Sequence, residues 1–437
     1  MEIVIKASQF ILSLSFLIVL HELGHFIPAK LFKTRVEKFY LFFDYKFSLV
    51  KKKIGDTVYG IGWIPLGGYV KISGMIDESM DTEQMKLPPQ PWEFRSKPAW
   101  QRLIIMLGGV IVNFILGILI YIMITFVWGV DFVKPQSVKH GFSVHESFEG
   151  YGFQQGDKIT KFNGKEPLDV TDINKHLFLR DLSSVEVLHD DGKTENIDIP
   201  ENIGEIMWEN GVMEPFQVRT LAVIDSIRPE SPADIAGLLK NDQVLSVDNK
   251  SVAYWNEFST LVLNSEGPID LKIERNGIAE TIQIIPEDDN RIGVYPQTED
   301  AIKIEHKNYT FLESISKGNS LAIWTLRDYV TQFKYVFTKK GATSIGGFIA
   351  IGNIFPATWS WKSFWGITAF LSIMLGFMNL LPIPALDGGH VVFTLYEIIT
   401  GRKPNDKFLE YAQITGFILL IGLLLLANGN DIVKLFS

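Results

Sequence analysis

Four long stretches without charged side chains constrain this chain more than any other feature of its sequence. A helix needs roughly 20 mostly apolar residues to cross the hydrocarbon layer of a membrane. The stretches lie between Lys6 and Lys30 (interrupted by Glu22), Arg102 and Asp131, Lys362 and Asp387, and Glu410 and Asp431. The first is not followed by a small-residue cleavage site, which argues against a signal peptide. The sequence therefore predicts a multi-pass α-helical membrane protein with four transmembrane helices.

Charge is distributed unevenly along the chain. Residues 131–300 include 15 basic and 32 acidic residues, whereas the remainder includes 26 basic and 18 acidic residues. The connections between the first and second spans, and between the third and fourth, are rich in lysine and arginine, which predicts that both face the cytoplasm. The acidic middle and both termini then lie on the opposite side, and this middle offers no basic surface for nucleic acid. The absence of cysteine excludes disulfide scaffolds and Cys-ligated metal sites.

The acidic middle is an internal repeat with an offset of 85 residues. Gly152, Asp157 and Asn163 in the first copy align with Gly237, Asp242 and Asp248 in the second. Short β-branched runs with Asp-Gly or Asn-Gly turns indicate hairpins in each copy, with helix-like pieces between them. A period of this length suits two tandem small domains rather than a solenoid.

These patterns divide the chain into five parts. We expect a first membrane part over 1–130, small α/β domains over 131–218 and 219–300, a linker over 301–361, and a second membrane part over 362–437. The linker contains an amphipathic stretch from Phe311 to Phe337. This stretch either lies along the outer membrane surface or packs as a linker helix.

The motif that carries chemistry lies inside the first predicted span, at His21-Glu22-Leu23-Gly24-His25. Residues four apart project from the same helix face, so two imidazoles can converge on one metal ion while Glu22 reaches its bound water. Ionisable residues inside the hydrocarbon layer are unfavourable and mark functional sites. The motif is nearer to Lys30 than to Lys6, which places it toward the cytoplasmic face. The alternative is a pair of buried histidines that ordinary hydrogen bonds satisfy.

A catalytic zinc site needs a third protein ligand and one open position. Five histidines belong to the translocated middle or its exit, which leaves Asp387 and His390 near the end of the third span. Asp387 follows Pro382 and Pro384, which break the helix at a depth where open backbone is tolerated only beside protein or water. This context favours Asp387 as the third ligand. Alternatively, Asp387 caps a helix that begins near Gly388.

Two motifs together resemble a known family. HELGH in a first span, with the sequence NLLPIPALDGG over residues 379–389 at the end of a later one, is similar to the site-2 protease family of intramembrane zinc metalloproteases. The stretch Gly62–Ile72 and the pair Asn113-Phe114 extend the likeness almost from end to end. Departures occur at Gly108–Val110 and Gly346–Phe348, which lack an expected proline.

The repeated middle adds to this resemblance. Ser231-Pro232-Ala233, leading to Ala236-Gly237 and then Asp242, resembles PDZ domains, and the first copy departs from that pattern around Phe148–Tyr151. Two inserted PDZ-like α/β domains between the second and third of four spans resemble the bacterial branch of the family that regulates sigma-E signalling.

The resemblance implies a metalloendopeptidase of the bacterial inner membrane, with periplasmic PDZ-like domains and an active site toward the cytoplasm. It implies that Zn2+ is held by His21, His25 and Asp387, with Glu22 as general base. It also implies that the substrate is positioned by Asn379, Pro382 and Pro384 and guided by a membrane-associated β-loop at Gly67 and Gly68. The implied substrate is a single-span membrane protein of the anti-sigma factor type, already cleaved once, with signal-peptide remnants as a second class. The PDZ-like domains either bind substrate chain ends or exclude them.

Two other classes of function fit parts of the sequence. A non-catalytic membrane scaffold would use the tandem domains to gather chain termini and would leave the HELGH motif as a relic. A zinc or proton transporter would use the buried histidines and Asp387, but four spans without an inverted repeat weaken this interpretation. Metal content and sensitivity to chelators distinguish the protease from the scaffold.

Overall fold

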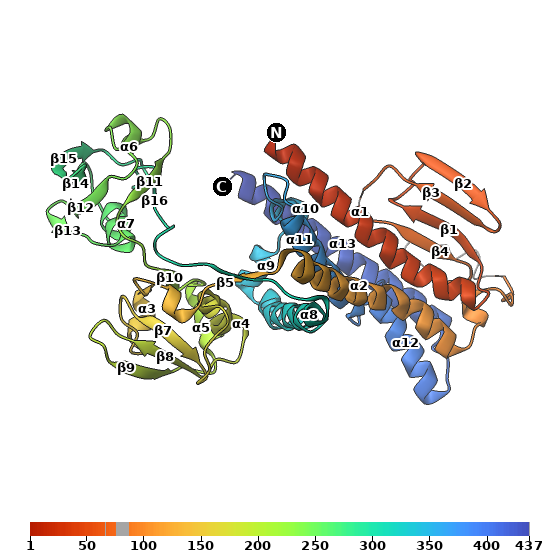
Figure 1. The fold of residues 1–437 in the computed structure, drawn as a ribbon. Coiled ribbons are helices and arrows are strands. Elements are labelled where there is room, and N and C mark those ends of the chain that lie inside the picture. Colours follow the sequence, from red (N-terminus) through yellow and green to blue (C-terminus); the bar gives the residue numbers. More distant parts are fainter. Residues whose placement is uncertain (66, 76–86, 437) are drawn as a thin grey trace. The chain divides into compact units, whose positions relative to one another are not determined.

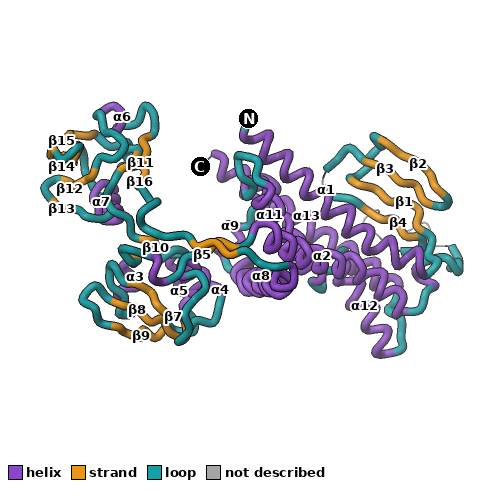
Figure 2. The backbone as a smooth tube through the Cα atoms, viewed as in Figure 1, coloured by secondary structure: helices purple, strands orange, loops and turns teal. Residues whose placement is uncertain are grey.

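A computed structural model describes residues 1–65, 67–75 and 87–436. Leu66, which lies in the Gly62–Ile72 stretch noted above, is outside the described residues. The chain divides into two compact units, one formed by Met1–Gly129 with Asn308–Ser437 and the other by Val130–Lys307. Figure 1 and Figure 2 show that the first unit is mainly helical and that the second combines strands with short helices.

Within the described residues, four helices of the first unit are long and apolar enough to cross a membrane. They are α1 (Glu2–Leu31), α2 (Ala99–Trp128), α11 (Trp361–Leu380) and α13 (Asp406–Phe436). The same unit contains α8 (Phe311–Phe333), α9 (Lys339–Ser344), α10 (Phe348–Asn353), α12 (Asp387–Thr400), η2 (Phe94–Ser96) and η5 (Lys334–Phe337). At about 1.5 Å per residue, even the 20-residue α11 spans the roughly 30 Å hydrocarbon layer. The predicted four-span membrane protein is confirmed.

Helix α2 is the centre of the first unit. It packs against α1, α8, α11 and α12. Where α1 and α2 meet, a side chain at Gly24 or Gly108 would collide with the backbone of the opposite helix. Small residues that allow such close approach are typical of helix pairs in membranes. The hydroxyl groups of Ser13 and Thr368, 2.9 Å apart, also connect α1 to α11.

The amphipathic stretch that begins at Phe311 forms α8, which packs inside the first unit. Gly318 lies directly against Ile122 of α2. The ring of Tyr329 makes edge-to-face contacts with Phe370 and Phe377 of α11. These contacts match the packed linker helix, one of the two predictions made for this stretch.

The connection between α1 and α2 contains a sheet with the strand order β2-β3-β1-β4. Its strands are β1 (Val36–Leu41), β2 (Val50–Ile54), β3 (Thr57–Ile61) and β4 (Tyr69–Ile72). β2 and β3 form a hairpin, β3 runs parallel to β1, and β4 runs antiparallel to β1. Gly68, just before β4, leaves no room for a side chain between Ile18 of α1 and the carbonyl group of Tyr40. The sheet therefore rests on α1, and its strands lie where the β-loop was predicted.

The second unit consists of two β-rich halves. The first half contains β6 (Phe142–Val144), β7 (Lys158–Phe162), β8 (Ser184–Leu188), β9 (Thr194–Asp198), β10 (Phe216–Val218), α3 (Glu146–Glu149), α4 (Ile173–Leu179), α5 (Ile203–Asn210), η3 (Pro135–Ser137) and η4 (Val170–Asp172). The second half contains β11 (Ile224–Ile227), β12 (Gln243–Val247), β13 (Lys250–Ser251), β14 (Ile269–Arg275), β15 (Ile278–Ile284), β16 (Val294–Pro296), α6 (Pro232–Ile235) and α7 (Trp255–Leu263). At the two ends of the unit, β5 (Val130–Phe132) pairs with β17 (Glu305–Lys307).

Strand pairing in the second unit reproduces the 85-residue repeat. The sheet β7-β8-β9 of the first half corresponds to β12-β14-β15 of the second. The ladder is irregular between Ile159 and Lys161 in one half and between Val244 and Ser246 in the other, and these positions are 85 residues apart. Each half also has its own buried apolar core. The internal repeat inferred from the sequence is therefore present in the structure.

Equivalent buried aspartates occur in both halves. Asp157 accepts a hydrogen bond from Nδ1 of His189 at 2.6 Å, and Asp242 accepts one from Nε of Arg275 at 2.8 Å. Burial of the His189 ring opposes its protonation, but hydrogen bonds to Asp157 and Glu195 outweigh this effect and raise the pKa of His189. The sequence alignment paired the two aspartates but missed their basic partners, because these lie 86 rather than 85 residues apart.

Candidate metal centre

Three side chains predicted to bind metal meet at one point of the first unit. His21 and His25 are one turn apart on α1, and Asp387 is the first residue of α12. Nε2 of His25 lies 3.3 Å from Nε2 of His21 and 3.3 Å from Oδ2 of Asp387. Nε2 of His21 lies 3.4 Å from the same oxygen. Ligands about 2.0–2.1 Å from a tetrahedral zinc ion are about 3.3–3.4 Å apart, so the three atoms fit this ion.

Oδ2 of Asp387 has surroundings that suit a bound cation. This atom is buried and has no hydrogen-bond partner within the described parts of the chain. A buried carboxylate oxygen without a donor is unfavourable, and a cation among the three atoms removes that penalty. The N-cap position of α12 belongs to Leu386, and no described side chain caps this end. The capping alternative therefore does not explain the position of the Asp387 carboxylate.

His390 was the other candidate for the third ligand. It lies on α12, one turn after Asp387. Among the described residues, the His, Asp and Glu group that could hold a metal ion consists of His21, His25 and Asp387, without His390. The structure thus separates the two candidates that the sequence had left near the end of the third span.

Two groups on α2 hold the imidazole rings in place. Nδ1 of His25 lies 2.9 Å from the carbonyl oxygen of Ile105, which can only accept, so Nδ1 carries the proton and Nε2 keeps its lone pair. Nδ1 of His21 lies 3.0 Å from the side-chain amide of Asn113, which is fully buried. Such outer partners orient metal-binding imidazoles. Sequence reasoning gave Asn113 no role, although a polar side chain inside an apolar span was a signal for one.

Gly109 provides space for both rings where α2 passes α1. A Cβ atom at this position would collide with Nε2 of His25 and would lie 2.6 Å from Cε1 of His21. The sequence marked Gly108–Val110 only as a departure from the family pattern. In the structure, the absence of a side chain at Gly109 allows the two imidazoles to sit side by side.

The chain between α11 and α12 is held open beside the metal centre. Pro382 and Pro384 lie in this break, where the helix was predicted to end. The backbone N–H of Ala385 donates to Oε1 of Gln413, a buried residue of α13, at 3.2 Å. Gly416 of α13 packs directly against the carbonyl group of Pro384. The last membrane helix therefore supports the segment that delivers Asp387, a role of Gln413 that sequence reasoning missed.

The remaining predicted site residues lie at different distances from the centre. Nδ2 of Asn379, near the end of α11, lies 3.3 Å from Nε2 of His21. A Cβ atom on Gly68 would lie 3.7 Å from Cγ of Glu22, the residue between the two histidines. Gly67 instead faces the ring of Phe43. The structure thus brings Asn379 and Gly68 to the centre and leaves Gly67 one residue farther away.

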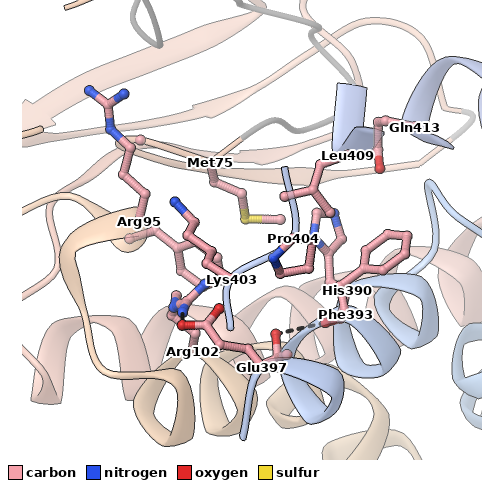
Figure 3. A pocket seen from close by; sticks show the side chains of 13 residues that line it. Met75, Arg95, Arg102, His390, Phe393, Glu397, Lys403, Pro404, Leu409 and Gln413 are labelled. Atoms are coloured by element: carbon pink, nitrogen blue, oxygen red, sulfur yellow. Dashed lines mark hydrogen bonds and ion pairs between the residues drawn. The ribbon is translucent and has the colours of Figure 1, made fainter. Parts of the chain in front are cut away.

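A pocket lies beside α12, next to the metal centre (Figure 3). An ion pair between Arg102 and Glu397, 2.5 Å long, connects α2 to α12 on its wall. His390, one turn along α12 from Asp387, also lines the pocket. Its other lining residues include Arg95, Phe393, Lys403, Leu409 and Gln413. The pocket therefore provides polar surroundings on the α12 side of Asp387.

Comparison with known proteins identifies the family. The family model for peptidase family M50 matches residues 9–423. Regulator of sigma-E protease RseP of Escherichia coli (strain K12) is 27% identical over 453 residues, covering 98% of both chains. Regulator of sigma E protease of Haemophilus influenzae is 28% identical over 454 residues, also covering 98% of both chains. A Neisseria meningitidis protein with a zinc metalloprotease name (NMA0084) is 29% identical over 463 residues, covering 98% of this chain and 99% of its own. This chain therefore belongs to peptidase family M50, the site-2 protease family, and is a bacterial zinc metalloendopeptidase with membrane-spanning helices.

Proposed function

We propose that this protein hydrolyses peptide bonds within or near the membrane-spanning segment of single-span membrane proteins. His21, His25 and Asp387 hold the zinc ion, and Glu22 is the general base. The observation that carries the proposal is the triangle of ligand atoms, with edges of 3.3–3.4 Å, between a membrane-spanning helix and the end of a broken one. This combination suits a protease whose substrate is itself embedded in the lipid bilayer.

The reaction is divided among a few side chains. A bound zinc ion lowers the pKa of water and polarises the scissile carbonyl group. Glu22 takes a proton from the attacking water as its oxygen bonds to the carbonyl carbon, and returns a proton to the nitrogen as the C–N bond breaks. Asn379, whose Nδ2 is 3.3 Å from Nε2 of His21, donates to the carbonyl oxygen as negative charge develops there. Ile105 and Asn113 keep the histidine rings oriented throughout.

The substrate must be extended before cleavage, because a helix hides its carbonyl groups in its own hydrogen bonds. Gly67 and Gly68 lead into β4, which is at the edge of the β2-β3-β1-β4 sheet. An edge strand can pair with an extended chain, and Gly68 lies beside Glu22. The sheet therefore acts as the membrane-associated β-loop that guides the substrate. Pro382 and Pro384 keep the opposite wall, the end of α11, open.

The distribution of charge supports an orientation in the bacterial inner membrane. Lysine and arginine residues concentrate in the connection between α1 and α2 and in that between α12 and α13. These connections face the cytoplasm, and the metal centre lies toward that side. The second unit then lies in the periplasm, where it meets the outer part of the substrate.

The halves of the second unit act as PDZ-like domains with different tasks. In the second half, a groove beside α7 is lined by Trp255, Phe258, Val262, Ile292 and Val294, among others. This groove fits an extended chain end added alongside β16. In the first half, residues 199–215 form α5, whose Trp208 stacks on Phe178 of α4, the counterpart of α7. The second half therefore binds chain ends, whereas the first half screens out bulky ones.

The substrate class follows the names of two relatives, which are regulators of sigma-E protease. We assign this chain a single-span anti-sigma factor that another protease has already shortened on the periplasmic side, as part of envelope stress signalling. Signal-peptide remnants are the second substrate class, because they are also single apolar helices without a bulky outer domain.

Replacing Glu22 by Gln tests the proposed mechanism. The variant should keep its zinc, because the three ligands are unchanged, but should cleave a membrane-spanning reporter at least about 10²-fold more slowly. Elemental analysis of the purified protein and gel analysis of the reporter measure the two effects. Glu2→Gln, at the start of the same helix, is the matched control and should cleave normally. Normal turnover by the Glu22 variant would remove Glu22 from the mechanism.

A further inference from the structure

A basic pocket lies at the end of α1, apart from the metal centre. It is lined by Lys30, Lys33, Thr34, Arg35, Asp56 and Trp92. Three of these side chains are positive and one is negative, so the lining carries a net positive charge. Within the described residues, the exposed side chains of Lys33 and Arg35 make no ion pair. Lys97 adds a further ammonium group beside Lys33, where it donates to the backbone carbonyl at 3.2 Å.

Thr34 gives an independent indication that this pocket takes a ligand. The residue is 2% exposed, and its hydroxyl group has no hydrogen-bond partner in the described part of the chain. Native structures seldom leave a buried hydroxyl group unsatisfied. Lys30 is already fixed at the pocket wall, since Nζ donates to Oγ1 of Thr57 at 2.8 Å. A phosphate group offers oxygen atoms that accept from hydroxyl, ammonium and guanidinium groups alike.

The position of the pocket along α1 matches the level of lipid headgroups. Lys30 ends the apolar part of this membrane-spanning helix, and Ile27 and Leu31 beside it have exposed side chains. Trp92 and Trp100 are also exposed near this end, and tryptophan is enriched where membrane meets water. A lipid bound here would therefore contact cations with its headgroup and apolar side chains with its acyl chains.

We propose that this pocket binds the phosphodiester headgroup of an anionic phospholipid. Lys30, Lys33 and Arg35 neutralise the phosphate, and the hydroxyl group of Thr34 donates to one of its oxygens. Basic pockets at the cytoplasmic ends of membrane helices are suited to such headgroups. Because Lys30 follows His25 by five residues on the same rigid helix, a bound lipid also sets the depth at which the metal centre lies in the membrane.

The test compares lipid binding by the full-length protein and two double variants. Each protein is delipidated in neutral detergent and titrated with phosphatidylglycerol or phosphatidylcholine, and native mass spectrometry counts the lipids that remain bound. Lys33→Gln with Arg35→Gln should weaken phosphatidylglycerol binding about thirty-fold, since each cation near a membrane surface contributes about five-fold. Lys51→Gln with Lys52→Gln removes the same charge from exposed positions on β2 and should leave binding unchanged. Zinc content reports that each variant is folded.

A third variant, Thr34→Val, tests the pocket without a change of charge. It should weaken phosphatidylglycerol binding several-fold, because the hydroxyl donor is lost. Equal weakening by both double variants would show diffuse attraction rather than a site, and unchanged binding by Lys33→Gln with Arg35→Gln would also overturn the proposal. Equal binding of phosphatidylcholine, or displacement of the lipid by millimolar inorganic phosphate, would exclude an anionic lipid as the specific ligand.

Discussion

Asp387 is the residue on which the metal centre depends most. Its Oδ2 is buried, lies 3.3–3.4 Å from two imidazole nitrogens, and has no hydrogen-bond donor among the described residues. The two histidines have partners on α2 that orient them with or without a metal ion. The carboxylate is therefore the group whose surroundings require a cation.

Replacing Asp387 by Asn should lower the zinc content of the purified protein. A neutral amide oxygen is a poor ligand for zinc, and the loss of affinity should exceed the roughly 10–100-fold that follows loss of an outer partner. Elemental analysis after dialysis against a weak chelator measures the effect. His390→Gln, one turn along α12 and outside the triangle, should keep its zinc. An unaltered zinc content in the Asp387 variant would remove this residue from the ligand set.

At this scale, local spacing carried the sequence prediction. The pattern HELGH is enough to place His21 and His25 on one helix face, and their Nε2 atoms do lie 3.3 Å apart. The roles of Asn113 and Gln413 could not be read in the same way. Their partners are 92 and 28 residues away in the chain, and such contacts exist only after the helices have packed.

Among the elements, α2 organises the metal centre although it contributes none of the predicted ligands. Gly109 leaves space for the rings, Ile105 and Asn113 orient them, and Arg102 pairs with Glu397 of α12. This helix therefore touches both elements that carry predicted ligands. A change in its packing should act on the zinc site without changing any ligand.

Gly109→Ala tests this role of α2. The added methyl group would collide with the ring of His25, so we expect at least about ten-fold weaker zinc binding, comparable to loss of an outer partner. Competition with a fluorescent chelator measures zinc affinity. Gly366→Ala in α11 is the control, because nothing lies within 4 Å of its added atom, and it should stabilise the helix by up to about 1 kcal/mol. Equal zinc affinity in the two variants would contradict the packing argument.

Element prediction was most successful where the membrane itself sets the length. Gaps between charges located α1, α2, α11 and α13, because the hydrocarbon layer requires about 20 apolar residues. The fate of α8 was not decidable, since an apolar helix face can pack on lipid or on another helix, and only the contact of Gly318 with Ile122 distinguishes them. The parallel pairing of β1 with β3 was also unpredicted, because no local pattern specifies which strands meet.

For the whole molecule, the second unit is an insertion with adjacent ends. β5 pairs antiparallel with β17, and Val130 lies opposite Lys307. Cα atoms of paired residues in such ladders are about 4.5–5.5 Å apart. The sequence predicted the repeated middle through its 85-residue offset. It did not predict that α5 would cover α4 in one copy only, because the inserted residues show no periodicity of their own.

Excising residues 130–307 and joining Gly129 to Asn308 through a short Gly-Ser linker tests the division of labour. The shortened protein should keep its zinc, because His21, His25 and Asp387 all belong to the first unit. It should also cleave reporters with a bulky outer domain, which the full-length protein rejects. Elemental analysis and a matched pair of reporters, with and without that domain, measure the two properties. Loss of zinc on excision would show that the second unit is needed to build the metal centre.

The distance along the chain between the two sides of the metal centre governs when the centre can form. Asp387 is 362 residues after His25. At about 5–20 residues per second, a ribosome needs roughly 20 to 70 s to add the carboxylate after the histidines. A nascent chain therefore carries an incomplete centre for most of its synthesis, and metal loading is among the last steps of biogenesis. Truncated products of stalled translation are thus proteolytically inert.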